Sequence, residues 1–104
     1  MSILTNNIRF SYLYRDYGNY KLFGETIFSN PENLSLSEID ARIKARLIDG
    51  EFFNPEKWGI DRLKFENHDY EQDHDWHEYG GIGITEDIAS NDRTIAKFIS
   101  IIEE

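Results

Sequence analysis

The sequence predicts a single α+β domain that spans residues 1–104. We expect about four mainly antiparallel strands and two helices packed on one face of the sheet, in the order β-β-α-β-β-α. Three observations support this fold class. An early stretch alternates apolar and polar residues at period two, and two later stretches repeat apolar residues at the helical spacing of 3.6. The length also matches one domain.

The first two strands are expected at residues 8–15 and 20–29. In the first, every second residue from Ile8 to Tyr14 is apolar or aromatic, which is typical of a half-buried strand. The connecting residues 16–19 contain Gly and Asn, which favour a turn, so the two strands are predicted to form a hairpin.

The first helix is predicted over Leu36–Asp49. Ser35 and Glu38 have the spacing of a capping box, in which each side chain bonds a free backbone N–H at the helix start. Gly50 stands where a left-handed residue would end the helix. The apolar stripe of this helix consists of Leu36, Ile39, Ile43 and Leu47.

Shorter patterns fill the second half of the chain. Residues 54–58 indicate a single helical turn with Pro at its first position. Residues 62–66 alternate and predict a third strand, and residues 76–85 predict a fourth strand with an irregularity at Gly80-Gly81. A final helix, capped by Asn91, is expected to bury one face made of Ile95, Phe98, Ile99 and Ile102.

Acidic residues concentrate in one stretch. The chain has 20 acidic and 11 basic residues and a net charge of −9. Residues 66–87, hereafter the acidic segment, contain eight acids and neither Lys nor Arg, so they hold −8 of that charge. Such a field repels phosphates and anionic lipid, which disfavours nucleic-acid and membrane partners and favours a basic protein or a cation. The segment could equally serve solubility alone.

Aromatic residues lie among these acids. Rings supply buried contact area and carboxylates supply orientation and fast association, so the mixture is typical of a surface that recognises a basic protein. The leading functional hypothesis is a small acidic interaction module of the antitoxin, immunity or anti-defence type. Its candidate partner-binding residues are Tyr70, Asp73, Asp75, Trp76, Glu78 and Tyr79. Alternatively, Trp76 closes the core of the sheet and the tyrosines bury their rings beneath exposed hydroxyls.

A metal site is the second hypothesis. His68, His74 and His77 lie close together in the sequence among carboxylates, and both groups ligate zinc and similar divalent ions. The candidate ligands are His74, His77 and Asp73, which would make the protein a metal-dependent enzyme or a metal-binding module. On a strand, however, residues three apart point to opposite faces, and a hydrated polar hairpin is the favoured explanation of the cluster. Apart from such a metal, no cofactor is expected.

Several classes of function find little support. The chain has no Cys, so disulfides and thiolate chemistry are excluded. It contains no Gly-x-Ser-x-Gly elbow or complete phosphate loop, so the sequence favours a protein that is not an enzyme without deciding the question. No stretch approaches the roughly 20 apolar residues of a membrane span, and the N-terminus does not read as a signal peptide. A cytoplasmic protein of open oligomeric state is therefore expected.

Several short runs resemble small uncharacterised bacterial proteins. The runs are Tyr12–Asp16, Asn19–Lys21, Gly24-Glu25 and Phe28–Pro31, with Leu47–Phe53 and Asp75–Glu78 further along the chain. The resemblance implies a bacterial origin and no particular activity, and it assigns no site residue.

Overall fold

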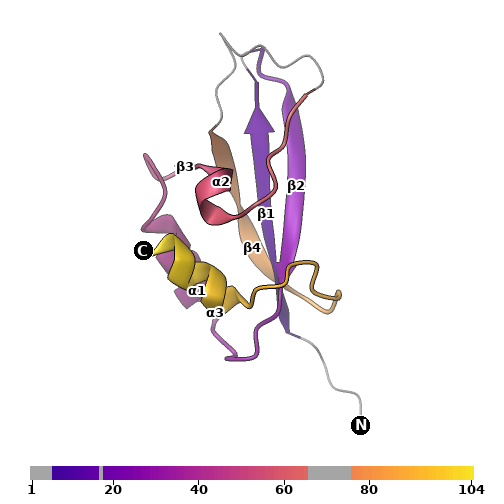
Figure 1. Ribbon diagram of the computed structural model, residues 1–104, viewed down its shortest axis with the longest axis vertical. Helices are drawn as coiled ribbons and strands as arrows, with labels where there is room; N and C mark the ends of the chain where they lie inside the picture. The colour runs from indigo at the N-terminus through magenta and orange to yellow at the C-terminus, as the bar shows by residue number, and fades with distance from the viewer. Residues whose placement is uncertain (1–5, 17, 66–75) are drawn as a thin grey trace.

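The computed structural model describes residues 6–16, 18–65 and 76–104 and confirms the α+β class (Figure 1). Four antiparallel strands form one sheet in the spatial order β2-β1-β4-β3. Along the chain the elements are β1 (Asn7–Arg15), β2 (Lys21–Phe28), α1 (Leu36–Lys44), β3 (Phe52–Phe53), α2 (Pro55–Trp58), β4 (His77–Thr85) and α3 (Ile95–Ile102).

β1 is the central strand on which the core is built. Its alternate residues from Ile8 to Tyr14 are buried, as the period-two pattern predicts. The ring of Phe10 lies 5.4 Å from that of Phe98 and 5.8 Å from that of Phe53. Buried residues of all three helices join β1 in one core, with Ile39 and Ile43 from α1. The helices therefore cover one face of the sheet, and Figure 1 shows α1 and α3 side by side with α2 above them.

The irregularity predicted at Gly80-Gly81 is a β-bulge. Ser11 pairs with Gly81, and the next residue of β1 pairs with Tyr79, so Gly80 is the extra residue. A Cβ on Gly80 would lie 3.0 Å from the carbonyl oxygen of Ser11. Only glycine allows β1 and β4 to approach this closely without a shift of the backbone.

The first helix is shorter than predicted. α1 begins as expected, with the Ser35 hydroxyl accepting the Glu38 N–H at 3.2 Å, but it ends at Lys44 instead of Asp49. Ile48 and Phe52 exchange backbone hydrogen bonds of 2.7 and 2.9 Å, which draws the chain out of the helix and into β3. Asp49 and Gly50, at φ values of 54° and 72°, form the tight turn between them. The prediction that Gly50 ends the helix was wrong.

The last helix also starts later than predicted. Thr94, not Asn91, caps α3 by accepting the Lys97 N–H at 3.1 Å. The Asn91 side chain instead accepts the backbone N–H of Arg93 at 3.0 Å. The predicted buried face of α3, however, is confirmed: Ile95, Phe98, Ile99 and Ile102 are all buried.

The strand predicted at 62–66 is wrong for its described residues, 62–65, which lie outside the sheet. The place beside β4 is taken by β3 instead. The Leu63 N–H donates to a side chain, Nε2 of His77, at 2.9 Å, and not to a neighbouring strand. The single helical turn predicted at 54–58 is confirmed as α2, with Asn54 accepting the Glu56 N–H at 3.0 Å.

Within the described part of the chain, no helix combines the length and the apolar character that crossing a membrane requires.

The buried face of α1 gives a direct test of this fold. Replacing Ile43, which is fully buried, by Ala should lower the free energy of unfolding by roughly 2–5 kcal/mol, because a cavity is left behind. Replacing Ser35 by Ala removes only a cap and should cost about 1 kcal/mol. Urea denaturation of both variants measures the difference, and equal costs would contradict the assigned buried face.

Candidate functional site

The acidic segment joins the sheet at the start of β4. Of the six residues predicted to bind a partner, three lie among the described residues: Trp76, Glu78 and Tyr79. Tyr70, Asp73 and Asp75 lie outside the described residues. The described side chains differ in what surrounds them, and each is considered in turn.

Trp76 precedes β4 and is 43% exposed. It is not a member of the hydrophobic core, which leaves much of the indole surface accessible to solvent. An exposed tryptophan within a strongly charged segment is suited to protein contact, because its large ring can bury apolar area on binding.

Two acids of the acidic segment are paired with arginines of β1. The Glu78 carboxylate accepts from the Arg15 guanidinium at 3.0 and 3.4 Å and is only 18% exposed. At the other end of β4, the Asp87 carboxylate accepts from Arg9 at 2.8 Å. Both pairs tie the described part of the acidic segment, residues 76–87, to the central strand and neutralise part of its charge.

Tyr79 links β4 to α1. Its hydroxyl donates to the Asp40 carboxylate at 2.7 Å. Burial and the neighbouring Asp40 carboxylate raise the pKa of Tyr79 far above its usual value. Hydrogen bonds from Lys44 and then Tyr79 lower the pKa of Asp40. A partner would therefore contact the ring of Tyr79 or displace Asp40, since the hydroxyl is already bonded.

His77 is fully buried in the aromatic part of the core. Its ring centre lies 5.1 Å from that of Tyr14 and 6.0 Å from that of Phe53. Because Nε2 accepts the Leu63 N–H, a metal ion at this nitrogen would have to displace that bond. The other candidate ligands, His74 and Asp73, lie outside the described residues, as does His68. The described residues hold no group of three metal-ligating side chains, and the metal site stays a prediction.

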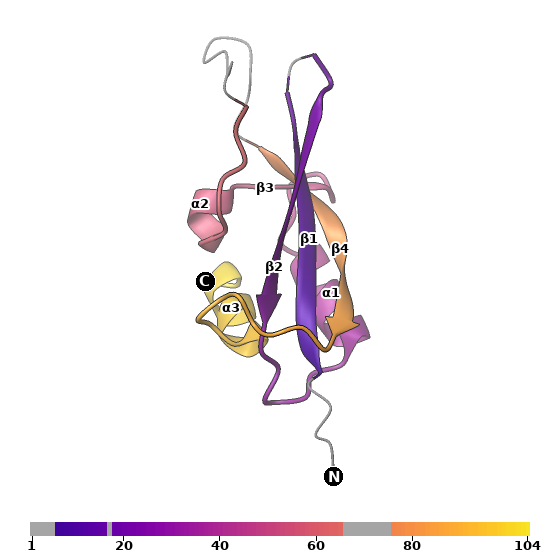
Figure 2. The same ribbon diagram turned by 90° about the vertical axis from the view of Figure 1, so that its right-hand side faces the viewer.

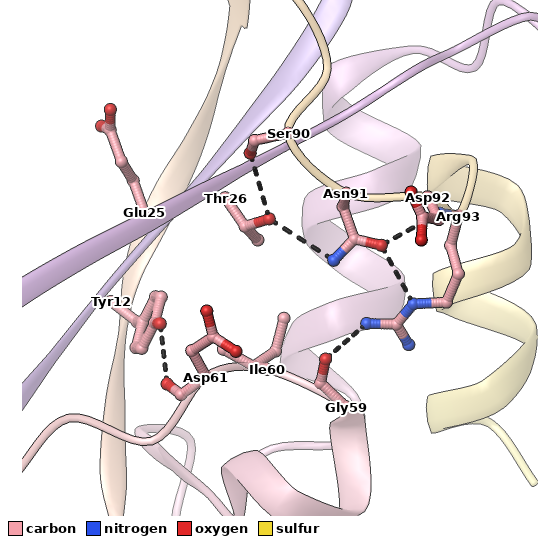
Figure 3. Close-up of a pocket in the computed structure, with 10 residues that line it drawn as sticks. All are labelled: Tyr12, Glu25, Thr26, Gly59, Ile60, Asp61, Ser90, Asn91, Asp92 and Arg93. Atoms are coloured by element: carbon pink, nitrogen blue, oxygen red, sulfur yellow. Dashed lines mark hydrogen bonds between the residues drawn. The ribbon is translucent and has the colours of Figure 1, made fainter.

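A polar pocket of about 500 Å³ lies at the edge of β2, and nothing in the sequence analysis pointed to it (Figure 3). It opens between β2, the turn after α2 and the segment before α3. Its walls carry three carboxylates and one guanidinium. The lining residues are Tyr12, Glu25, Thr26, Gly59, Ile60, Asp61, Ser90, Asn91, Asp92 and Arg93.

Arg93 holds the two loops of this pocket together. Its guanidinium donates to the carbonyl oxygens of Trp58 and Gly59 at 3.0 and 2.7 Å and to the Asn91 side chain at 3.2 Å. Burial lowers the pKa of Arg93. Because its N–H groups already donate to these acceptors, Arg93 has a structural role, and the three carboxylates determine the electrostatics of the pocket. The pocket is therefore suited to ligands that carry hydrogen-bond donors or a positive charge.

Tyr12 closes the base of the pocket. Its hydroxyl donates to the carbonyl oxygen of Asp61 at 2.8 Å. Burial, with a smaller contribution from Asp61, raises the pKa of Tyr12 to about 12. The pocket residues come from four separate parts of the sequence, and no motif or spacing connects them.

Comparison with known proteins gives no relative to guide the assignment: no protein family, curated protein or solved structure was found to match this chain.

Tyr79 and Tyr12 form a matched pair for a test of pH dependence. Tyr79→Phe removes a bond to a carboxylate and should cost about 1 kcal/mol of stability at pH 7. Because the pKa of Asp40 is lowered in the folded state, this stabilisation is present above the ordinary aspartate pKa of 3.8 and is lost as the pH falls through the lowered value.

Tyr12→Phe is the control, because its hydroxyl bonds a backbone carbonyl that does not titrate. Its cost should stay constant over the same pH range. Urea denaturation of both variants between neutral and acidic pH measures this, and a Tyr79→Phe penalty that does not shrink in acid would contradict the assigned bond.

Proposed function

We propose that this protein is a small interaction module that binds a basic partner protein through its acidic segment. The observation that carries the proposal is the segregation of charge: residues 66–87 hold eight acids and no Lys or Arg, while the chain as a whole has a net charge of −9. A field of one sign on one part of a small protein attracts the opposite charge from a distance and orients it on approach.

The described side chains support this proposal in two ways. First, Trp76 is substantially exposed within the segment, where it can supply apolar contact area. Second, among the described acids of the segment, Glu78 pairs with Arg15 and Asp87 with Arg9, whereas Glu86 is exposed. An exposed carboxylate and an exposed indole in the same segment are consistent with a surface that a basic partner contacts.

An acidic surface with exposed aromatic rings suits a protein that neutralises a basic toxin, effector or nuclease, so the proposed role is that of an antitoxin, immunity or anti-defence factor. In such a complex the carboxylates would govern the rate of association, and the aromatic rings would govern the lifetime of the complex. Catalysis is not part of the proposal.

Affinity capture followed by reconstitution tests this function. The tagged protein is exposed at low salt to a lysate of its source organism, and captured proteins are purified and rebound one at a time. The proposal requires a basic protein that binds stoichiometrically and whose affinity falls as salt rises, because exposed charges are screened. Failure to reconstitute any such complex, with crosslinking also negative, would overturn it.

Neutralising part of the acidic segment should act on association. Asp73→Asn with Asp75→Asn should slow association with the reconstituted partner and flatten its salt dependence, while changing dissociation little. Glu32→Gln with Glu51→Gln is the matched control, because it changes the net charge equally at exposed positions outside the segment. Stopped-flow kinetics at several salt concentrations compares the association rates of the two double variants. Equal effects on the association rate would show that only net charge matters.

Truncating Trp76 should act on dissociation. Trp76→Ala is expected to speed dissociation roughly 30-fold, the change that corresponds to a hot-spot loss of about 2 kcal/mol. The same substitution should leave the fold intact, because Trp76 lies outside the core. A thermal melt accompanies the kinetics, and a folded Trp76→Ala variant with unchanged dissociation would remove Trp76 from the interface.

A further inference from the structure

β2 is an edge strand, and half of its edge is covered by the chain itself. The Ile27 N–H donates to the Ser90 hydroxyl at 2.9 Å, and the Ile27 carbonyl accepts the backbone N–H groups of Ser90 and Asn91. Beyond it, the Ser29 carbonyl accepts the Ile95 N–H at 2.8 Å. Figure 2 shows the segment before α3 crossing this end of β2.

The other half of the edge, from Lys21 to Glu25, has no such cover from the described residues. Since the N–H and C=O groups of Ile27 point away from β1, and the direction alternates along a strand, those of Lys21, Phe23 and Glu25 also point outward. No described residue bonds these backbone groups. Such an edge is a template for a further strand.

The side chains of this open half are self-complementary. Lys21, Phe23 and Glu25 project from the same face, with Phe23 73% exposed and Lys21 in no ion pair with any described residue. In an antiparallel pair centred on Phe23, each Phe23 opposes its counterpart, and each Lys21 opposes Glu25 of the other strand. All the outward residues then form hydrogen-bonded pairs.

Other registers lack this match. A pair centred on Lys21 or on Glu25 would oppose like charges, which is destabilising. Registers shifted toward the end of β2 meet Ser90 and Asn91, which already occupy Ile27. The open edge and the charge pattern therefore favour the same partner strand, which is β2 itself.

In this register, the polar pocket of one copy would lie beside Tyr20 of the other copy. Tyr20 is 71% exposed, and in the pair centred on Phe23 it would oppose Thr26 of the other copy. Thr26 lines the pocket, together with Glu25 and Asp61 (Figure 3). Residues of like parity project to the same face of the sheet, so the phenol of Tyr20 would approach the mouth of a pocket whose carboxylates accept hydrogen bonds.

We propose that two copies of this chain associate through the open half of β2, forming a continuous sheet across a two-fold axis at Phe23. The paired segment is short, so the dimer should be reversible and belong to the weaker class of interfaces. This association is independent of the basic partner, because Lys21, Phe23 and Glu25 lie outside the acidic segment.

Sedimentation equilibrium of the full chain tests the proposal directly. Over protein concentrations from about 1 μM to about 1 mM, where weak and moderate dissociation constants are measurable, the mass should rise from 12.3 kDa toward twice that value. Lys21→Glu and Glu25→Lys should each weaken dimerisation about tenfold or more, because each replaces two attractive cross-strand pairs by repulsive ones.

A mixture of the two variants provides the decisive measurement. Lys21→Glu supplies acidic residues at both positions and Glu25→Lys supplies basic residues at both, so the mixed dimer regains two opposite-charge pairs. The mixture should therefore dimerise when neither variant does alone. Tyr20→Ala should also weaken the wild-type dimer, because the phenol enters the pocket of the other copy.

Lys57→Glu and Glu32→Lys are the matched controls, since they reverse exposed charges away from β2. Circular dichroism checks that each variant is folded, in particular Glu25→Lys, which also loses the pairing of Glu25 with Arg9 at 3.3 Å. A wild-type mass that stays at 12.3 kDa at every concentration would overturn the proposal. So would a dimer insensitive to both charge reversals, or a mixture that behaves like its separate components.

Discussion

Burial of one face of β1 is the constraint on which the rest of this fold depends. The strand is paired on both sides, so its backbone hydrogen bonds are made within the sheet and its inward side chains can be fully buried. Phe10 at its centre contacts aromatic rings from β3, α2 and α3. Each of these elements is too short to be stable alone, and each is held by its contact with this ring cluster.

The sequence patterns that predicted the fold correctly are those that report burial or local capping. The alternation of β1, the Ser35 cap and the apolar face of α3 depend on neighbours within the same element. The strand expected at 62–66 shows the limit of this reasoning. Leu63 and Phe65 do face the protein, near Gly24 and Tyr14, but the backbone there makes no ladder. An alternating sequence pattern indicates which side chains face the protein. It does not indicate which groups the backbone hydrogen-bonds to.

The candidate site could be predicted only in part, for a related reason. The charge of the acidic segment can be read from the sequence, because it is the sum of the charges of its residues. The commitment of Tyr79 to Asp40 and of Glu78 to Arg15 is not visible, because each pair joins residues far apart in the sequence. The polar pocket likewise combines residues from four separate parts of the sequence, and Arg93 holds the end of α2 beside the segment before α3.

The bond from Leu63 to His77 has a consequence for how this chain can vary. It joins two positions fourteen residues apart in the sequence and holds the backbone after α2 against the start of β4. An apolar ring at position 77 would fill a similar volume but would leave the Leu63 N–H without its acceptor, at a cost of about 1 kcal/mol or more. The residue at position 77 can therefore be exchanged without loss of stability only together with a new acceptor for that N–H.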